Sequence, residues 1–106
     1  MRINGKGFKA GVAESWFARA RGLSGKDSGN MLFVFPLKFR PGFWMFRMRY
    51  PIWISFLEDD GTVFEVKRAE PMGFNMKSCR VYRPSRGCSY VLESEFEVKQ
   101  GDKIEW

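Results

Sequence analysis

Histidine is absent from the chain, and this absence alone excludes several classes of enzyme. Ser-His-Asp and Cys-His catalysis both need an imidazole base, so neither is available. Cysteine is scarce too: two cysteines cannot supply the roughly four Cys or His ligands of a structural zinc site, or the thiolates of an iron–sulfur cluster. The sequence also has no glycine-rich phosphate loop. We therefore predict neither a metal centre nor a bound cofactor.

Long apolar runs are missing as well. The run Met31–Leu37 is short and is broken by Pro36, so it cannot form a membrane-spanning helix. The first residues place Arg2, Lys6 and Lys9 among glycines, without the apolar segment of a secretory signal. These features predict a cytoplasmic protein with no membrane span.

Acidic residues are rare in the first half of the chain. Residues 1–53 contain ten Lys or Arg and two acids, so their net charge is +8. Residues 54–106 contain eight Lys or Arg and ten acids, so their net charge is −2. Residues 28–57 and 71–92 contain no acid. A basic surface attracts phosphates, anionic lipid or an acidic protein. The alternative is that a net charge of +6 serves only solubility.

The residues that are present follow the pattern of short strands. A chain of 106 residues has room for one domain, which we place over residues 1–106. Turn residues recur at roughly ten-residue intervals, as in small β proteins. We predict a mainly β barrel or sandwich of about six to eight short, mostly antiparallel strands. The expected strands are 8–13, 31–35, 43–48, 52–57, 62–67, 80–82, 88–93 and 103–106.

Two local signals within this pattern are specific. Asp60-Gly61 lies between two apolar runs and predicts an antiparallel hairpin of 52–57 with 62–67. One short helix is expected near Ser15–Arg21, because Ser15 can cap it and Gly22 can end it. A helix of barely two turns needs tertiary packing to form.

A series of short motifs runs along nearly the whole chain. In order they are 19–23 (RARGL), 29–35 (GNMLFVF), 43–45 (FWM), 51–57 (PIWISFL), 60–61 (DG), 90–93 (YVLE) and 101–102 (GD). In this order the motifs resemble domain-of-unknown-function family number 192, which implies a compact β-rich domain without an established activity. The chain departs from the pattern of that family in two places: residues 46–48 are Phe-Arg-Met where Lys-Asn-Thr is usual, and Trp53 replaces an aspartate.

An aromatic and basic segment follows the turn at 38–42. If residues 43–50 are extended, their side chains alternate between two faces, one aromatic and one ending in arginines. The aromatic face is then either core or a stacking platform edged with positive charge for single-stranded nucleic acid, a sugar or a peptide. The residues of this predicted surface are Trp44, Phe46, Arg47, Arg49 and Tyr50.

Arg21 and Glu93 both lie in motifs of the family, Arg21 beside Gly22 and Glu93 after an apolar strand. Because buried charges are rarely left unpaired, the two residues are candidates for an ion pair. The alternative is that Glu93 is a cleft carboxylate with a shifted pKa.

Cys79 and Cys88 would face each other in a hairpin centred on residues 83–84. In a cytoplasmic protein two reduced structural thiols are the expected state, with a disulfide as the alternative. Their spacing is not Cys-x-x-Cys, although Arg80 and Arg86 can lower the pKa of a nearby thiol.

Three functions remain open for a chain with these features. The first is a non-catalytic binding module for a ligand or protein, and we expect it to be monomeric. The second is a binder of single-stranded nucleic acid, whose affinity falls with salt. The third is an enzyme that uses a cleft carboxylate or a thiol. No catalytic residue is assigned.

Overall fold

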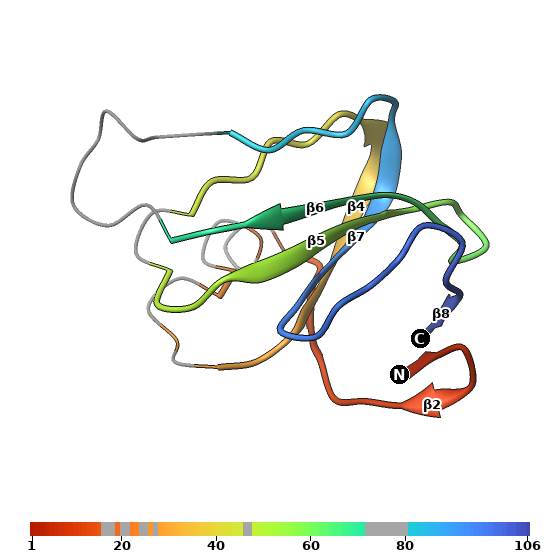
Figure 1. Ribbon diagram of the computed structural model, residues 1–106. Coiled ribbons are helices and arrows are strands. Elements are labelled where there is room, and N and C mark those ends of the chain that lie inside the picture. The colour runs from red at the N-terminus through yellow and green to blue at the C-terminus, as the bar shows by residue number, and fades with distance from the viewer. Residues whose placement is uncertain (16–18, 20–21, 24–25, 27, 46–47, 72–80) are drawn as a thin grey trace.

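The computed structural model describes residues 1–15, 19, 22–23, 26, 28–45, 48–71 and 81–106, which form a mainly β structure with two sheets (Figure 1). Within these ranges there is no helix long and apolar enough to cross a membrane. The strands are β1 Arg2–Ile3, β2 Lys6–Gly7, β3 Gly11–Ala13, β4 Met31–Phe39, β5 Ile52–Leu57, β6 Val63–Ala69, β7 Cys88–Ser94 and β8 Ile104–Glu105.

The larger sheet has the strand order β3-β4-β7-β5-β6. β3 runs parallel to β4, and the other neighbours are antiparallel. A barrel closes only when its two edge strands pair. Here β3 has three residues, and on the opposite edge the Glu65 carboxylate of β6 accepts the Ser85 N–H at 2.7 Å. In the described part of the chain the sheet is therefore open, and the predicted barrel is wrong.

Each face of the larger sheet carries an apolar core, because successive side chains of a strand point to opposite faces. One face is covered by the smaller sheet and the other by loops. The loop-side core includes Phe33, Met45, Ile54, Phe56, Tyr82 and Val91. The sheet-side core includes Leu32, Leu57, Val63, Leu92, Val98 and Ile104.

The hairpin around Asp60-Gly61 is confirmed. β5 has the predicted bounds, and it pairs antiparallel with β6. The Asp60 carboxylate accepts the Thr62 N–H at 2.9 Å, which closes the turn. Gly61 has a φ of +91°, the left-handed region that suits glycine.

The sequence predicts only one strand of the smaller sheet, β2-β1-β8: the last one, expected at 103–106. β1 and β2 flank Asn4-Gly5, whose φ angles of 50° and 84° are those of a tight hairpin turn. Asn-Gly is itself a hairpin signal, but strands of two residues have no alternating pattern to support it. β8 pairs with β1, so the two ends of the chain lie close together (Figure 1).

Two predicted elements differ from the structure in their extent. β4 continues past Pro36 to Phe39, because its pairing with β7 is irregular between Val34 and Phe39 and a missing N–H costs nothing there. Residues 43–48 are not a strand where they are described. Phe43 forms a single bridge with Tyr82, and the Met48 N–H donates to the Met45 carbonyl at 3.0 Å, a bond that the ladder of a strand does not contain.

The predicted helix at Ser15–Arg21 falls largely outside the described residues. Of its residues only Ser15 and Arg19 are described, and Arg19 has helical conformation. No helix with defined bounds is found among the described residues. The Arg19 N–H donates to the Ser15 carbonyl at 2.9 Å. The Arg19 side chain donates to the Val34 carbonyl at 3.0 Å and lies 5.5 Å from the centre of the Phe35 ring. These contacts hold Arg19 against β4.

Asn30 joins three segments of the chain. Its amide nitrogen donates to the Lys9 carbonyl, and its amide oxygen accepts the Glu95 N–H, both at 2.9 Å. We expect Asn30→Ala to lower the free energy of unfolding by about 1–3 kcal/mol, because the two backbone groups lose their partner. Urea unfolding followed by circular dichroism measures this. Gln100→Ala, an exposed amide, is the control, and an equal effect of both substitutions would contradict the prediction.

Candidate functional site

The candidate site is built on two extended segments, residues 39–44 and 81–87, which we call the ribbon. They lie side by side above the larger sheet, one following β4 and the other preceding β7 (Figure 1). Phe43 and Tyr82 exchange backbone hydrogen bonds of 2.9 and 2.7 Å, and Phe39 pairs with Cys88 at the other end. Each segment contains a proline, which favours an extended backbone without regular pairing.

Side chains along the ribbon alternate between the core and the surface. This alternation follows from the extended backbone of both segments. The inward residues, all buried, are Pro41, Phe43, Tyr82 and Pro84. The outward residues, all exposed, are Arg40, Gly42, Trp44, Val81, Arg83 and Ser85.

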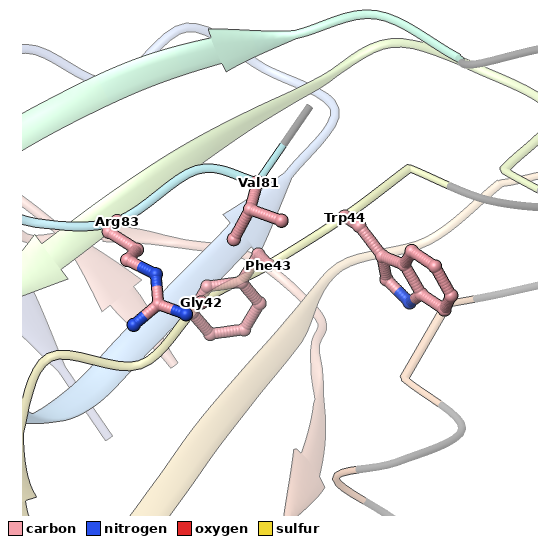
Figure 2. A pocket seen from close by; sticks show the side chains of 5 residues that line it. All are labelled: Gly42, Phe43, Trp44, Val81 and Arg83. Atoms are coloured by element: carbon pink, nitrogen blue, oxygen red, sulfur yellow. The ribbon is translucent and has the colours of Figure 1, made fainter. Parts of the chain in front are cut away.

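Four of the outward residues, together with Phe43, line an open depression of about 300 Å³. Trp44 and Val81 are large apolar side chains that are 54% and 49% exposed, and both line this depression. Figure 2 shows Val81 and the Phe43 ring between the indole of Trp44 and the guanidinium of Arg83. The depression therefore combines a flat apolar surface with a positive charge. Its lining residues are Gly42, Phe43, Trp44, Val81 and Arg83.

Gly42 keeps the floor of the depression open. A Cβ atom at this position would lie 2.8 Å from Val81 Cγ1 and 3.3 Å from Arg83 Nε. Because these contacts are closer than van der Waals separation, any larger residue would displace both side chains. Glycine is the residue that lets the two segments approach this closely.

The two segments of the ribbon contain no acidic residue, and the carboxylate of Glu65 on β6 reaches the ribbon by accepting hydrogen bonds from the Ser85 N–H and hydroxyl at 2.7 and 2.8 Å. Arg40 spans the ribbon, with Nε donating to the Pro84 carbonyl at 2.8 Å. Near the Phe39–Cys88 end, Arg86 is paired with Glu58, and Lys38 with Asp59 at 3.0 Å. The positive charge of the outward face thus lies on Arg40 and Arg83.

The predicted aromatic and basic surface is only partly brought together. Trp44 and Arg49 are exposed, whereas Tyr50 packs against the loop-side core and its hydroxyl donates to the Gly29 carbonyl at 3.0 Å. The predicted alternation places Trp44 and Tyr50 on one face, and the structure does not keep them together. Phe46 and Arg47 lie outside the described residues.

Val81 and Arg83, the partners of Trp44 in the depression, were missed as part of this surface. The acid-free stretch at 71–92 was the signal that could have found them. It does not reveal which distant segment they would join, because the pairing of Phe43 with Tyr82 is non-local.

Glu93 lies on β7 between Met31 of β4 and Ile54 of β5, and is only 6% exposed. Burial raises the pKa of its carboxyl to about 8. Burial and then the charges of Glu95 and Glu93 raise the pKa of the Tyr50 hydroxyl to about 12. Arg21, the predicted partner of Glu93, lies outside the described residues, so the ion pair stays a prediction.

Cys88 is buried and has no disulfide partner among the described residues, and Cys79 lies outside them. Burial, with a smaller contribution from the charge of Glu65, raises the pKa of the Cys88 thiol to about 11. A thiol with this pKa is protonated at neutral pH and is a poor nucleophile. Across the described ranges, no three Cys, Asp or Glu residues gather to hold a metal ion.

Two solved structures have a fold similar to that of this chain. No curated protein matches the chain significantly. A Novosphingobium aromaticivorans DSM 12444 protein of unknown function is 23% identical with a TM-score of 0.78, over 93% of this chain and 75% of the other. A Sinorhizobium meliloti 1021 protein, described as a candidate transcription regulator, is 24% identical with a TM-score of 0.76, over 89% and 78%. At these identities the likeness shows the fold alone.

The family resemblance seen in the sequence motifs is confirmed. The model of domain of unknown function 192, described as an uncharacterised ACR family, matches residues 1–106. The match covers the ribbon, both sheets and the segments between them. The chain therefore belongs to the DUF192 family.

Proposed function

We propose that this protein is a non-catalytic binding domain whose ligand carries a flat ring next to an anionic group. The observation that supports this most directly is the shared depression, which joins the exposed indole of Trp44 to the guanidinium of Arg83. The ring stacks on the indole, and the anion accepts hydrogen bonds from the guanidinium. Arginine suits this role because its planar fork matches carboxylate and phosphate oxygens.

The composition of the depression favours binding over catalysis. Among the described residues that line it, none has a carboxylate, thiol or hydroxyl side chain. A reaction that needs a general acid, a general base or a nucleophile finds none there. Glu93 and Cys88 are buried and do not line it.

The experiment is a nitrogen–proton NMR titration with small ring-bearing anions. Nucleoside monophosphates are the first probes, since one structural relative is described as a candidate transcription regulator. Hexuronic acids follow as sugar rings with a carboxylate. We expect the indole N–H signal of Trp44 to shift saturably while that of Trp106, half-exposed elsewhere, stays in place. A Trp44 signal that is unmoved by every probe would overturn the proposal.

Substitution of Trp44 by alanine should weaken binding of the best probe about 5- to 150-fold. This range corresponds to the roughly 1–3 kcal/mol that stacking one base on an aromatic side chain contributes. Affinity is measured from the same titration, using the Arg83 Nε–H signal. Trp106→Ala is the matched control, because it removes a tryptophan of similar exposure outside the depression. Equal losses in the two variants would count against a site at Trp44.

A further inference from the structure

We infer that the ligand of this site is single-stranded nucleic acid, a polymer that extends beyond the depression. This inference rests on the proposed function and identifies the class of ligand. The inference comes from the order of the outward side chains along the ribbon and from the open shape of the depression. A small ring-bearing anion would use only part of this surface.

The outward face presents a ring and positive charges in sequence. From Trp44 the exposed side chains pass to Arg83 and then to Arg40, and Arg40 contacts the segment beyond Arg83 through the Pro84 carbonyl. Residues 40 and 44 are about 13 Å apart along an extended backbone, at roughly 3.3 Å per residue. A single isolated ring with one anion would occupy only the Trp44–Arg83 part of this path. A chain that repeats base and phosphate would use all of it.

Arg40 keeps donors for a second phosphate. Its Nε–H is used within the ribbon, which fixes the direction of the guanidinium. Because arginine carries five N–H donors and Arg40 is exposed, four donors remain for a ligand. Arg83 lines the depression itself, so the two guanidinium groups succeed each other along the same face.

The shape of the depression also favours a polymer. It is open to solvent rather than enclosed, so a ligand longer than one ring and one anion can lie across it. An exposed indole offers a stacking surface to any unpaired base, whereas a base within a duplex has both faces covered by its neighbours. We therefore expect single strands to bind better than duplexes, with little dependence on base sequence.

The test is fluorescence anisotropy with a labelled oligothymidylate at roughly 50 and 200 mM salt. Two phosphate contacts on a single strand give a slope of log affinity against log salt of about −1.4, which is about a 7-fold loss over this range. Arg83→Gln and Arg40→Gln should each make that slope shallower by about 0.7. Arg2→Gln, an exposed arginine on β1, removes the same charge outside the ribbon and should leave the slope unchanged.

The possible outcomes separate this inference from the proposed function. Oligonucleotide binding that is tighter than mononucleotide binding, prefers single strands and depends on Trp44 supports both. If mononucleotides shift the Trp44 signal and the oligonucleotide binds no more tightly than they do, the polymer inference fails and the proposed binding function stands. Equal competition by duplex DNA, or by inorganic polyphosphate, which has no rings, also overturns the polymer inference. If no probe moves Trp44, both proposals fail.

Discussion

Replacing Gly61 with alanine is expected to lower the free energy of unfolding by more than about 4 kcal/mol, an exceptional effect for one methyl group. Gly61 is buried in the β5–β6 turn. A Cβ atom there would lie 2.0 Å from the Ile104 carbonyl oxygen and 3.3 Å from the Trp106 ring. The first contact is with backbone, so no side-chain rotation relieves it.

The clash would separate β8 from the turn. The Ile104 N–H donates to the Gly61 carbonyl at 2.9 Å, and the Ile104 side chain is buried in the sheet-side core. Moving this strand away therefore costs a hydrogen bond and part of the core packing. A φ of +91° adds backbone strain for any residue with a Cβ.

Gly101→Ala is the matched control for this measurement. Gly101 has nearly the same φ, +95°, but a Cβ atom there would meet nothing within 4 Å. Its substitution should cost about 1–2 kcal/mol, the strain of the left-handed conformation alone. Urea unfolding of both variants separates strain from clash. A Gly61→Ala protein as stable as Gly101→Ala would show that β8 does not pack against the turn.

The second large effect is a loss of stability with rising pH that depends on Glu93. Its pKa is 4.5 in an unfolded chain and about 8 in the fold. Between these values the folded carboxyl keeps its proton while the unfolded one releases it. The free energy of unfolding therefore falls as pH rises, by about 1.4 kcal/mol per unit and up to about 5 kcal/mol in all.

Glu93→Gln should remove this pH dependence, because an amide does not titrate. Urea unfolding at several values between about pH 5 and 8 measures the slope. We expect the variant to match the native protein near pH 5 and to be more stable near pH 8. Glu97→Gln, at an exposed position, is the control and should keep the native slope. Identical slopes for the native protein and the Glu93 variant would contradict the burial of a titrating carboxyl.

Opposite contributions act at lower pH. Hydrogen bonds from Thr62 lower the pKa of Asp60, and hydrogen bonds from Ser85, opposed by burial, lower the pKa of Glu65. A carboxyl group whose pKa is lowered in the fold stabilises the fold at pH values above its unfolded pKa. This stabilisation is lost as the pH falls and the carboxylate is protonated. Stability should therefore be greatest near the ordinary pKa of a glutamate, between the two effects.

Sequence reasoning succeeded where the chemistry was local. The Asp60-Gly61 turn and the β5 bounds depend on neighbouring residues, and they were predicted correctly. Asn4-Gly5 carries a similar signal, but the strands beside it are too short to show a period. The edges of the larger sheet depend on pairing between distant segments, so an open sheet could not be distinguished from a barrel.

The candidate site shows the same limit. Trp44 was identified from its aromatic neighbours, yet the predicted alternation would also have exposed Tyr50. In the structure Tyr50 packs against the loop-side core instead. Val81 and Arg83 join Trp44 because Phe43 pairs with Tyr82, a contact between residues 39 positions apart that no local pattern encodes.

The smaller sheet has a consequence for how the protein is made on the ribosome. β1 lies between β2 and β8, so its residues 2–3 have their outer partner at residues 104–105. An N-terminal hairpin of four paired residues is marginal in water until that strand arrives. Closing so long a loop is slow. Residues 2–3 are therefore synthesised long before their outer partner at residues 104–105, and the sheet-side core stays incomplete until β8 has left the ribosome.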